Sequence, residues 1–453
     1  MGVKILILFL CFIINYNLFN LIGMSSDSMI YWTFFFNATF SLFFFIYDGL
    51  NKKLNARLIF FFYSYLFLTI VPYLQFVESV WMSSQSVTQI LNTNIIIIIY
   101  NITFMIGYSI PKYQSIKSDN NNSNINFYIK KSSFTLSIYF LLILHIIFTL
   151  LGGFSLTRSI FFDLFGGYNP ISLVIDIVFK SLILYLFIFY LLSKESKSTL
   201  SFILLSYLFI YYNNPIASSR FYAFMAYLLI LIFIFKRISK INFLFNLVFI
   251  FGILGSFYQN AFRAAFTPTN GGSEGTSSFE IGYFFQGHFD SYENISNTVT
   301  YVQDFGIVWG KQLLGVFLFW IPRSFWMNKP EGSGTFLGKN FYSFDTTNQN
   351  LNISAPLLME EYLNFGIIGV LLGTFILGYL VSFLDIKYSY SNYLMNDLPK
   401  NRFTSKLIGF IFYVSFLGLF LFILRGDLLS SLSYTFGIFI SYRITRKLVL
   451  YKY

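Results

Sequence analysis

The chain has 453 residues, of which 56% are hydrophobic and only 11% are charged. A soluble globular domain carries about 25% charged residues, so the composition excludes that class and predicts an integral membrane protein. The formal net charge of +11 would fit a nucleic-acid partner. The basic residues, however, form short clusters between apolar runs, as in cytoplasmic loops of membrane proteins, so no nucleic acid is expected.

Apolar runs of about 20 residues recur along the chain, which predicts transmembrane helices rather than a β-barrel. About twelve spans, with both termini in the cytoplasm, put every basic cluster on one side of the membrane. One such cluster is Lys52, Lys53 and Arg57. The predicted spans lie near residues 4–22, 29–48, 58–77, 88–110, 134–152, 170–192, 199–213, 221–235, 242–260, 364–384, 407–424 and 428–443.

The predicted fold is all-α and has three parts. Residues 1–260 hold transmembrane helices 1–9, and residues 261–363 form one large periplasmic loop. Residues 364–453 hold helices 10–12 and a short cytoplasmic tail. The loop is far too long and too polar to cross a bilayer in one span.

An aromatic and apolar segment runs through this loop from Gly315 to Trp326 and is interrupted by Pro322. Because proline is costly inside a helix, one straight span is not expected there. We predict short interfacial helices, with Trp320 and Trp326 at the depth of the lipid headgroups.

Four arginines are predicted on the outer face, against the usual preference of basic residues for the cytoplasmic side. They come from separate segments: Arg220, Arg263, Arg323 and Arg425. Arginine in this position suggests an anionic partner, because its guanidinium holds phosphate oxygens in pairs. Lys329 is a further candidate. The alternative is that these residues cap helix C-termini or reach lipid headgroups.

Three carboxylates accompany these cations. Glu360 and Glu361 stand at the mouth of the tenth span, and Asp427 lies in the tight turn before the last one. A carboxylate there could accept a proton in a reaction, or simply favour the positive end of a helix. No His/Cys cluster or closely spaced aspartate pair is present, so no metal site is predicted.

Other polar residues have simpler interpretations. Asp176 and Lys180 are four residues apart in the sixth span and can pair on one helix face, or belong to a polar pathway. His145 is expected to be packed or hydrogen-bonded inside the membrane. His288, in the outer loop, is either exposed or a base.

The chain resembles the bacterial O-antigen polymerases, the Wzy-type family. The resemblance covers the whole layout of about a dozen spans with one large late loop, and an unusual richness in Phe, Ile and Tyr. Locally it rests on four blocks: Ser218-Ser219-Arg220, Ile321-Pro322-Arg323 through Trp326 to Lys329-Pro330, Glu360 through Asn364-Phe365-Gly366, and Leu424-Arg425-Gly426-Asp427.

The resemblance implies a reaction at the periplasmic face of the bacterial inner membrane. A growing glycan on undecaprenyl diphosphate is transferred to a sugar hydroxyl of a new lipid-linked repeat unit, and undecaprenyl diphosphate leaves. The glycosyl-diphosphate bond supplies the energy, so no cofactor is expected. The implied partners are the lipid-linked oligosaccharide, membrane lipids and a polysaccharide chain-length regulator.

The implied reaction also divides the candidate residues by role. Cations are needed where charge develops on the diphosphate, and a carboxylate is needed to take the acceptor's proton. The diphosphate would contact Arg220, Arg263, Arg323, Lys329 and Arg425. The catalytic candidates are Glu360, Glu361 and Asp427.

Two alternatives remain open. An O-antigen ligase has a similar layout and depends on a loop histidine, a role His288 could fill. A lipid-linked oligosaccharide flippase also has many spans, but it needs a polar central cavity rather than a long outer loop. Intramembrane charges are few in this chain, which counts against a flippase.

Overall fold

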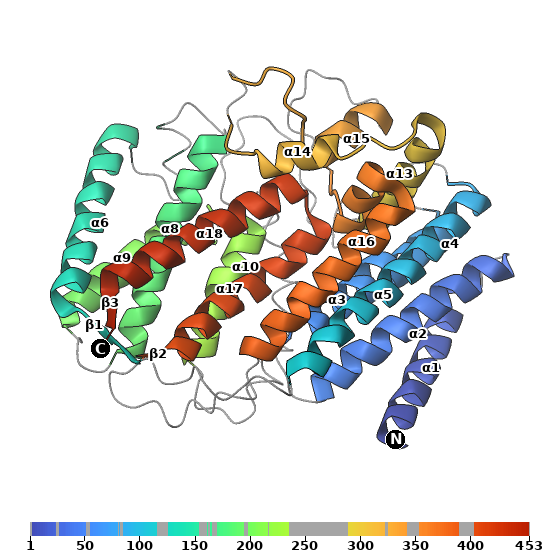
Figure 1. Cartoon of the computed structure of the whole chain (residues 1–453), viewed down its shortest axis with the longest axis horizontal. Coiled ribbons are helices and arrows are strands. Elements are labelled where there is room, and N and C mark those ends of the chain that lie inside the picture. The colour runs from blue at the N-terminus through green and yellow to red at the C-terminus, as the bar shows by residue number, and fades with distance from the viewer. Residues whose placement is uncertain are drawn as a thin grey trace, which may run out of the picture. The chain divides into compact units, whose positions relative to one another are not determined.

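A computed structural model covers the chain (Figure 1). The residues that the structure describes are 2–23, 27–50, 55–79, 81, 85–115, 126–153, 161, 164, 170–193, 198–215, 217–234, 289–321, 325–341, 353–388 and 403–452. They are predominantly helical, which confirms the all-α class.

The helices in the first half are α1 (Gly2–Ile22), α2 (Ser28–Leu50), α3 (Ala56–Tyr65), the π-helix η1 (Leu66–Ile70), α4 (Val71–Val77), α5 (Val87–Ser115), α6 (Lys131–Gly152), α8 (Pro170–Leu192), α9 (Thr199–Tyr212) and α10 (Arg220–Ile234). Those in the second half are α13 (Ser291–Phe305), α14 (Lys311–Phe317), α15 (Ser333–Phe341), α16 (Leu357–Tyr388), α17 (Ser405–Arg425) and α18 (Leu428–Val449).

Among the described residues, eight helices are long and apolar enough to cross a membrane. They are Gly2–Ile22, Ser28–Leu50, Ala56–Val77, Val87–Pro111, Lys131–Gly152, Ser172–Leu192, Leu357–Tyr388 and Leu407–Arg425. Each coincides with a predicted span, so a multi-pass membrane protein is indicated.

The remaining predicted spans have different outcomes. Those near 199–213 and 221–235 fall on α9 and α10, which are apolar but shorter, and the one near 428–443 falls on α18. The span near 242–260 lies outside the described residues. The total of twelve and the periplasmic placement of the loop therefore stay predictions.

The chain forms two compact units. Unit 1 comprises Met1–Ser118, Gly275–Lys387 and Phe420–Leu432. Unit 2 comprises Asp119–Glu274, Tyr388–Leu419 and Ser433–Tyr453.

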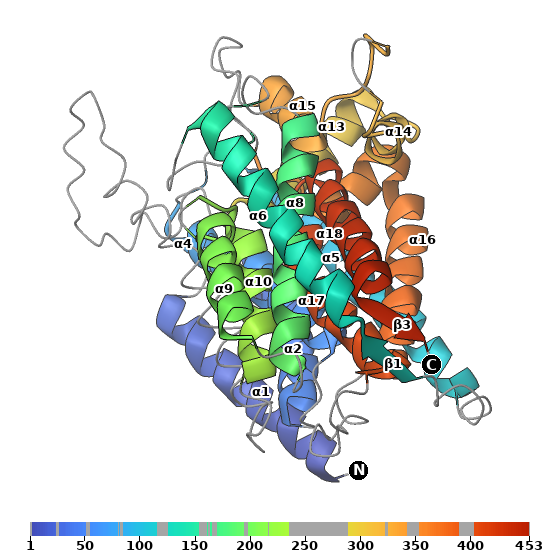
Figure 2. The ribbon, with the colours of Figure 1, turned by 90° about the vertical axis from the view of Figure 1, so that its left-hand side faces the viewer.

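In unit 1 the loop helices lie beside one end of α16. Figures 1 and 2 both show α13, α14 and α15 near the end at which α16 begins. The loop contains short helices, as predicted, whereas their position at the membrane interface stays a prediction. The backbone N–H of Val308 donates to the carbonyl of Leu363 at 3.0 Å, which attaches the loop directly to α16.

The helix α16 is sharply bent after its second turn. Phe365 (φ −141°) and Gly366 (φ 61°) depart from helical geometry, and Gly366 adopts a left-handed conformation that favours glycine. The bend brings the first two turns against the next part of the same helix, where a side chain at Gly369 would overlap the carbonyl of Glu361. Glu360 and Glu361 thus lie on a short helical segment rather than on the long span.

A second irregularity lies between α3 and α4. Pro72 has no backbone N–H, and the turn before it widens into the π-helix η1, where the N–H of Val71 donates to the carbonyl of Leu66, five residues earlier. Such widened turns are frequent at functional sites. The widened turn contains Phe67, whose ring lies below the guanidinium of Arg425.

Unit 2 contains a small antiparallel sheet of β1 (Asn126–Ile129), β2 (Phe403–Thr404) and β3 (Leu450–Lys452), in the order β2-β1-β3. Tyr128 pairs with Tyr451 in this sheet. Figure 2 shows β1 and β3 side by side. The sheet joins three segments that are distant in the sequence.

Two intramembrane predictions are confirmed in unit 2. Lys180 Nζ lies 2.8 Å from Asp176 Oδ2, so these residues form a buried ion pair. The ring of His145 is buried and hydrogen-bonded through Nδ1 to Tyr212 (3.0 Å) and through Nε2 to Tyr207 (2.9 Å).

Candidate functional site

The candidate site is a pair of buried carboxyl groups in unit 1. Glu360 stands in the first turn of α16, and Asp427 occupies the turn between α17 and α18. Their exposed fractions are 0% and 5%. The two carboxyl groups interact electrostatically with each other. The structure thus brings together two of the three predicted catalytic residues, which are 67 positions apart in the chain.

The same two backbone segments supply hydrogen bonds to both carboxyl groups. From the start of α15, the hydroxyl of Ser333 donates to Glu360 Oε2 at 2.6 Å, and the N–H of Gly334 donates to Asp427. From the start of α18, the N–H of Leu428 donates to Glu360. The next N–H, of Leu429, donates to Asp427 Oδ1 at 2.7 Å. Because adjacent donors alternate between the two acids, the carboxyl groups lie close together.

Local sequence explains this arrangement. Asp427 is the residue before α18 and caps its first free N–H groups, a position that aspartate favours. Three helices, α15, α16 and α18, begin around the pair, and the positive end of a helix stabilises negative charge. Gly332 lies against the pair, where a Cβ would overlap Asp427 Oδ2. Only glycine fits there without displacing the carboxylate.

The pKa of Asp427 reflects two opposing influences. Burial raises it above the ordinary value, because the charged form loses hydration. Hydrogen bonds from the N–H groups of Leu429, Ser430 and Gly334 lower it, because they stabilise the charged form. Burial is the larger influence, and the pKa remains raised.

Arg425, two residues before Asp427, supplies a cation to this region. Its Nη2 lies 3.3 Å from Asp290 Oδ1, and its guanidinium lies 5.6 Å above the centre of the Phe67 ring. Asp290 also accepts hydrogen bonds from Asn294 (3.1 Å) and from the N–H of Ser354 (3.0 Å). These contacts fix Asp290, and through it Arg425, at the end of α17.

Lys329 has a different environment from the one expected of a diphosphate ligand. Its Nζ donates to the carbonyls of Phe319 (2.7 Å) and Ile321 (2.9 Å), and the residue is buried. These bonds close a turn of the loop. The neighbouring Trp320 is 65% exposed, whereas Trp326 is half-buried, and their depth at the lipid headgroups stays a prediction.

Glu361 points away from Glu360, because successive residues on a helix are separated by about 100°. Its Oε2 accepts a 2.6 Å hydrogen bond from Thr374, beyond the bend of α16, and it lies near the hydroxyl of Tyr100 on α5. Glu361 therefore stabilises the bend of α16 and does not belong to the carboxyl pair.

The remaining predicted residues lie outside the described part of the chain or in unit 2. Arg263, Arg323 and His288 lie outside the described residues. Arg220 begins α10 in unit 2 and is half-buried. Convergence of the arginines on one diphosphate stays a prediction.

Three participants were not predicted from the sequence: Asp290, Gly332 and Ser333. Asp290 precedes a polar helix, and the short run Glu331-Gly332-Ser333-Gly334 looks like an ordinary connection. Their roles depend on contacts between distant segments. The Gly332-Ser333-Gly334 run was the one available signal, since serine commonly begins helices.

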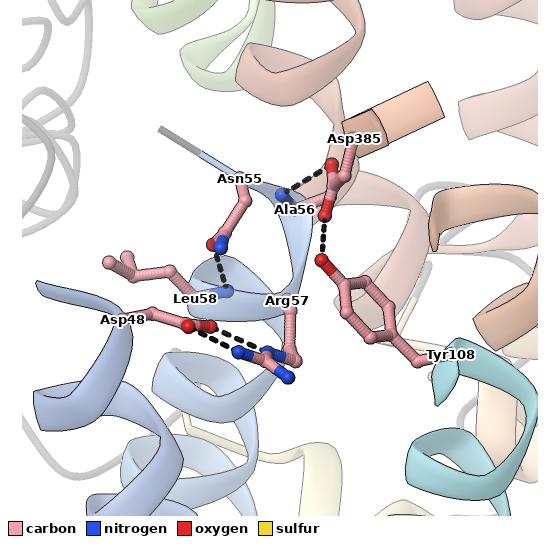
Figure 3. A network of polar contacts seen from close by, with 7 residues as sticks. All are labelled: Asp48, Asn55, Ala56, Arg57, Leu58, Tyr108 and Asp385. Carbon is pink, nitrogen blue, oxygen red and sulfur yellow. Dashed lines mark hydrogen bonds and ion pairs between the residues drawn. The ribbon is translucent and has the colours of Figure 1, made fainter. Parts of the chain in front are cut away.

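A second buried polar cluster lies at the other end of α16 (Figure 3). Asp48 and Arg57 form a two-point ion pair, and the Nε contact is 2.7 Å long. Asp385 accepts hydrogen bonds from the N–H of Ala56 (3.0 Å) and the hydroxyl of Tyr108 (2.7 Å). This cluster joins α2, α3, α5 and α16, and it was not predicted.

In the part of the chain that the structure describes, no group of three or more His, Cys, Asp or Glu residues is placed to hold a metal ion. Comparisons with protein-family models, with curated proteins and with solved structures found no match to this chain.

Proposed function

We propose that the chain polymerises undecaprenyl-diphosphate-linked oligosaccharide repeat units into O-antigen or a related surface polysaccharide. The observation that supports this proposal most is the position of Glu360 beside Asp427, two residues from Arg425. These residues belong to two of the blocks on which the resemblance rests. A cation two residues from one acid of a buried carboxyl pair suits a reaction that releases a diphosphate and removes a hydroxyl proton.

In the proposed reaction a sugar hydroxyl of the new repeat unit attacks C1 of the growing glycan. The bond from C1 to the diphosphate oxygen breaks, and its electron pair leaves with undecaprenyl diphosphate. Arg425 would contact the diphosphate as its charge rises, and a carboxylate of the pair would receive the hydroxyl proton. Asp290 would hold the guanidinium in place.

The remaining cations take graded roles in this proposal. Arg220 and Arg323 are proposed as further diphosphate ligands because they lie in blocks that carry the resemblance. Arg263 is proposed as a weaker candidate because it is an arginine of the predicted outer face. Lys329, whose ammonium is bonded to two carbonyls, would act by shaping the loop. Glu361, bonded to Thr374, would act by holding the bend of α16.

Deletion of the gene in its host tests the proposal against its alternatives. Loss of a polymerase leaves the lipopolysaccharide core carrying one repeat unit, whereas loss of a ligase or a flippase leaves bare core. The gel pattern of the deletion strain, and its restoration by the plasmid-borne chain, separates the three. Bare core would rule out the polymerase.

Purified chain provides the direct assay. Lipid-linked repeat units extracted from the deletion strain should be converted into a ladder of longer lipid-linked glycans without added nucleotide. The His288→Ala variant should keep this activity, because a carboxylate supplies the base. A variant that folds but makes no polymer would favour a histidine-dependent reaction of the ligase kind.

Membrane placement is tested separately. Reporter fusions after Ser278 and at the C-terminus should report opposite sides of the inner membrane, with the loop in the periplasm. The same side for both would overturn the proposed topology.

A further inference from the structure

We infer that Glu360 and Asp427 hold one proton between them, that Glu360 carries it, and that the ionised Asp427 receives the proton of the acceptor hydroxyl. The protonation assignment stands on the structure of the pair alone. The catalytic assignment rests on the proposed function. It names which acid does the chemistry in a pair that the sequence could not rank.

The pair holds a single proton. Two ionised carboxylates that lie close together repel, and burial increases that repulsion because water is excluded. Among the described residues, no ion pair joins a lysine or arginine to either acid. A single shared proton removes the repulsion and leaves one charge, which the helix N-termini around the pair stabilise.

The hydrogen bonds to the two acids place the proton on Glu360. Asp427 accepts three backbone N–H bonds, from Leu429, Ser430 and Gly334, and such bonds favour the ionised form. Glu360 accepts one hydroxyl and one N–H bond, and its Oε1 is buried with no hydrogen-bond partner in the described part of the chain. An ionised Oε1 would be an uncompensated buried charge, so the proton belongs on Glu360.

Other titratable groups lie on the elements that carry the pair. Each has contacts of its own. Arg425 on α17 pairs with Asp290, next to α13, and Lys339 on α15 pairs with Glu331. On α16, Glu361 bonds to Thr374, and in the loop Lys329 bonds to two carbonyls. The charge of the pair is therefore set mainly by the two acids themselves.

The ionised Asp427 is the acid placed to receive the hydroxyl proton. Asp427 is the more exposed of the two acids and follows Arg425 by two residues. In the proposed transfer the acceptor O–H proton passes to Asp427 as the oxygen bonds to C1 and the diphosphate leaves. Asp427 then releases that proton to water. Glu360 keeps its own proton throughout and acts as a positioning residue that leaves Asp427 as the single charge.

Infrared spectroscopy of the purified protein tests the protonation without reference to activity. A protonated carboxyl gives a C=O stretching band that an ionised carboxylate lacks. Near neutral pH this band should be weaker in Glu360→Gln than in the wild type. In Asp427→Asn its intensity should equal that of the wild type. Glu331→Gln is the matched control, since Glu331 is ion-paired with Lys339 and should contribute no such band.

Loss of the band in Asp427→Asn but not in Glu360→Gln would reverse the assignment. No loss in either variant would show that the pair holds no proton. Both substitutions should preserve the fold, because glutamine resembles a protonated glutamate and asparagine caps helices as well as aspartate does. Size-exclusion profiles in detergent check this.

Polymerisation by the same variants tests the catalytic half. Asp427→Asn should lose about 10²–10⁴-fold in rate, the usual contribution of a general base. Glu360→Gln should lose about tenfold, as expected for an altered hydrogen bond. Equal losses, or a greater loss in Glu360→Gln, would remove Asp427 from the role of base while leaving the polymerase proposal intact. A wild-type chain that makes no polymer would remove the proposed function but leave the infrared result standing.

Discussion

The hydroxyl of Ser333 donates a 2.6 Å hydrogen bond to the carboxyl of Glu360, across 27 positions of the chain. This bond joins a short helix of the loop to the first turn of the bent helix α16. Together with the bond from Gly334 to Asp427, it makes the start of α15 part of the carboxyl site. The loop is thus held in place by both acids of the carboxyl pair.

The Ser333→Ala variant tests this attachment. A buried carboxyl oxygen would lose its hydroxyl donor, which typically costs about 1–3 kcal/mol. We expect lower thermal stability in detergent and slower polymerisation. Ser109→Ala is the control, because the hydroxyl of Ser109 donates to the carbonyl of Met105 in its own helix. Equal stability of the two variants would mean that the bond to Glu360 contributes little.

The Gly332→Ala variant tests the fit around Asp427. The added methyl group would overlap Asp427 Oδ2, so either the carboxylate or the start of α15 must move. We expect a loss of polymerisation of at least tenfold, since small misplacements at a reacting centre are costly. Gly2→Ala is the control, because its Cβ would meet no atom within 4 Å. An active Gly332→Ala enzyme would show that Asp427 has room to shift.

Hydropathy predicted the spans well because lipid imposes a long and nearly uniform pattern on a helix. It could not predict the bend in α16, which depends on two residues, Phe365 and Gly366, inside a continuous apolar run. It also could not separate Glu360 from Glu361. They are neighbours in the sequence, yet they point to different partners after folding.

Charge patterning had a similar limit. Arg57 was counted in a cytoplasmic basic cluster with Lys52 and Lys53, and the positive-inside rule treats all three alike. Folding buries Arg57 against Asp48, whereas Lys52 and Lys53 lie outside the described residues. Composition can therefore assign a side of the membrane but cannot tell a solvated cation from one half of a buried ion pair.

Arg425 is expected to tolerate neither alanine nor lysine. Removing one donor to a developing oxyanion costs about 10²–10³ in rate, and lysine keeps the charge but loses the paired donors of the guanidinium. Chain-length distributions at matched expression measure the effect, with the exposed Arg443 changed to alanine as control. Arg220→Ala and Arg323→Ala belong to the same series. Normal ladders from all three alanine variants would make these arginines membrane anchors and end the diphosphate proposal.

The raised pKa of Asp427 predicts a direction for the pH dependence of stability. The folded protein holds this proton more tightly than the unfolded chain does. The group's contribution is therefore fully present below the unfolded pKa, about 3.9, and is lost as pH rises through the folded pKa. Relative to Asp427→Asn, the wild type should become less stable across that interval. Thermal unfolding in one detergent over a pH series measures the difference, and a growing advantage of the wild type would mean that the pKa is lowered.

The cluster at the far end of α16 should matter for stability and not for chemistry (Figure 3). Arg57→Ala would leave Asp48 as an unpaired buried charge, a loss that typically costs about 3–5 kcal/mol. Replacing Asp48 by alanine as well should recover part of this, because no unpaired charge then remains. Lys387→Ala, which removes an exposed cation near Asp385, is the control. Thermal unfolding measures the stabilities, and polymerisation per folded molecule, assayed well below the transition, should stay near the wild-type value. A variant that unfolds normally but polymerises poorly would instead connect this end of α16 to the carboxyl pair at the other.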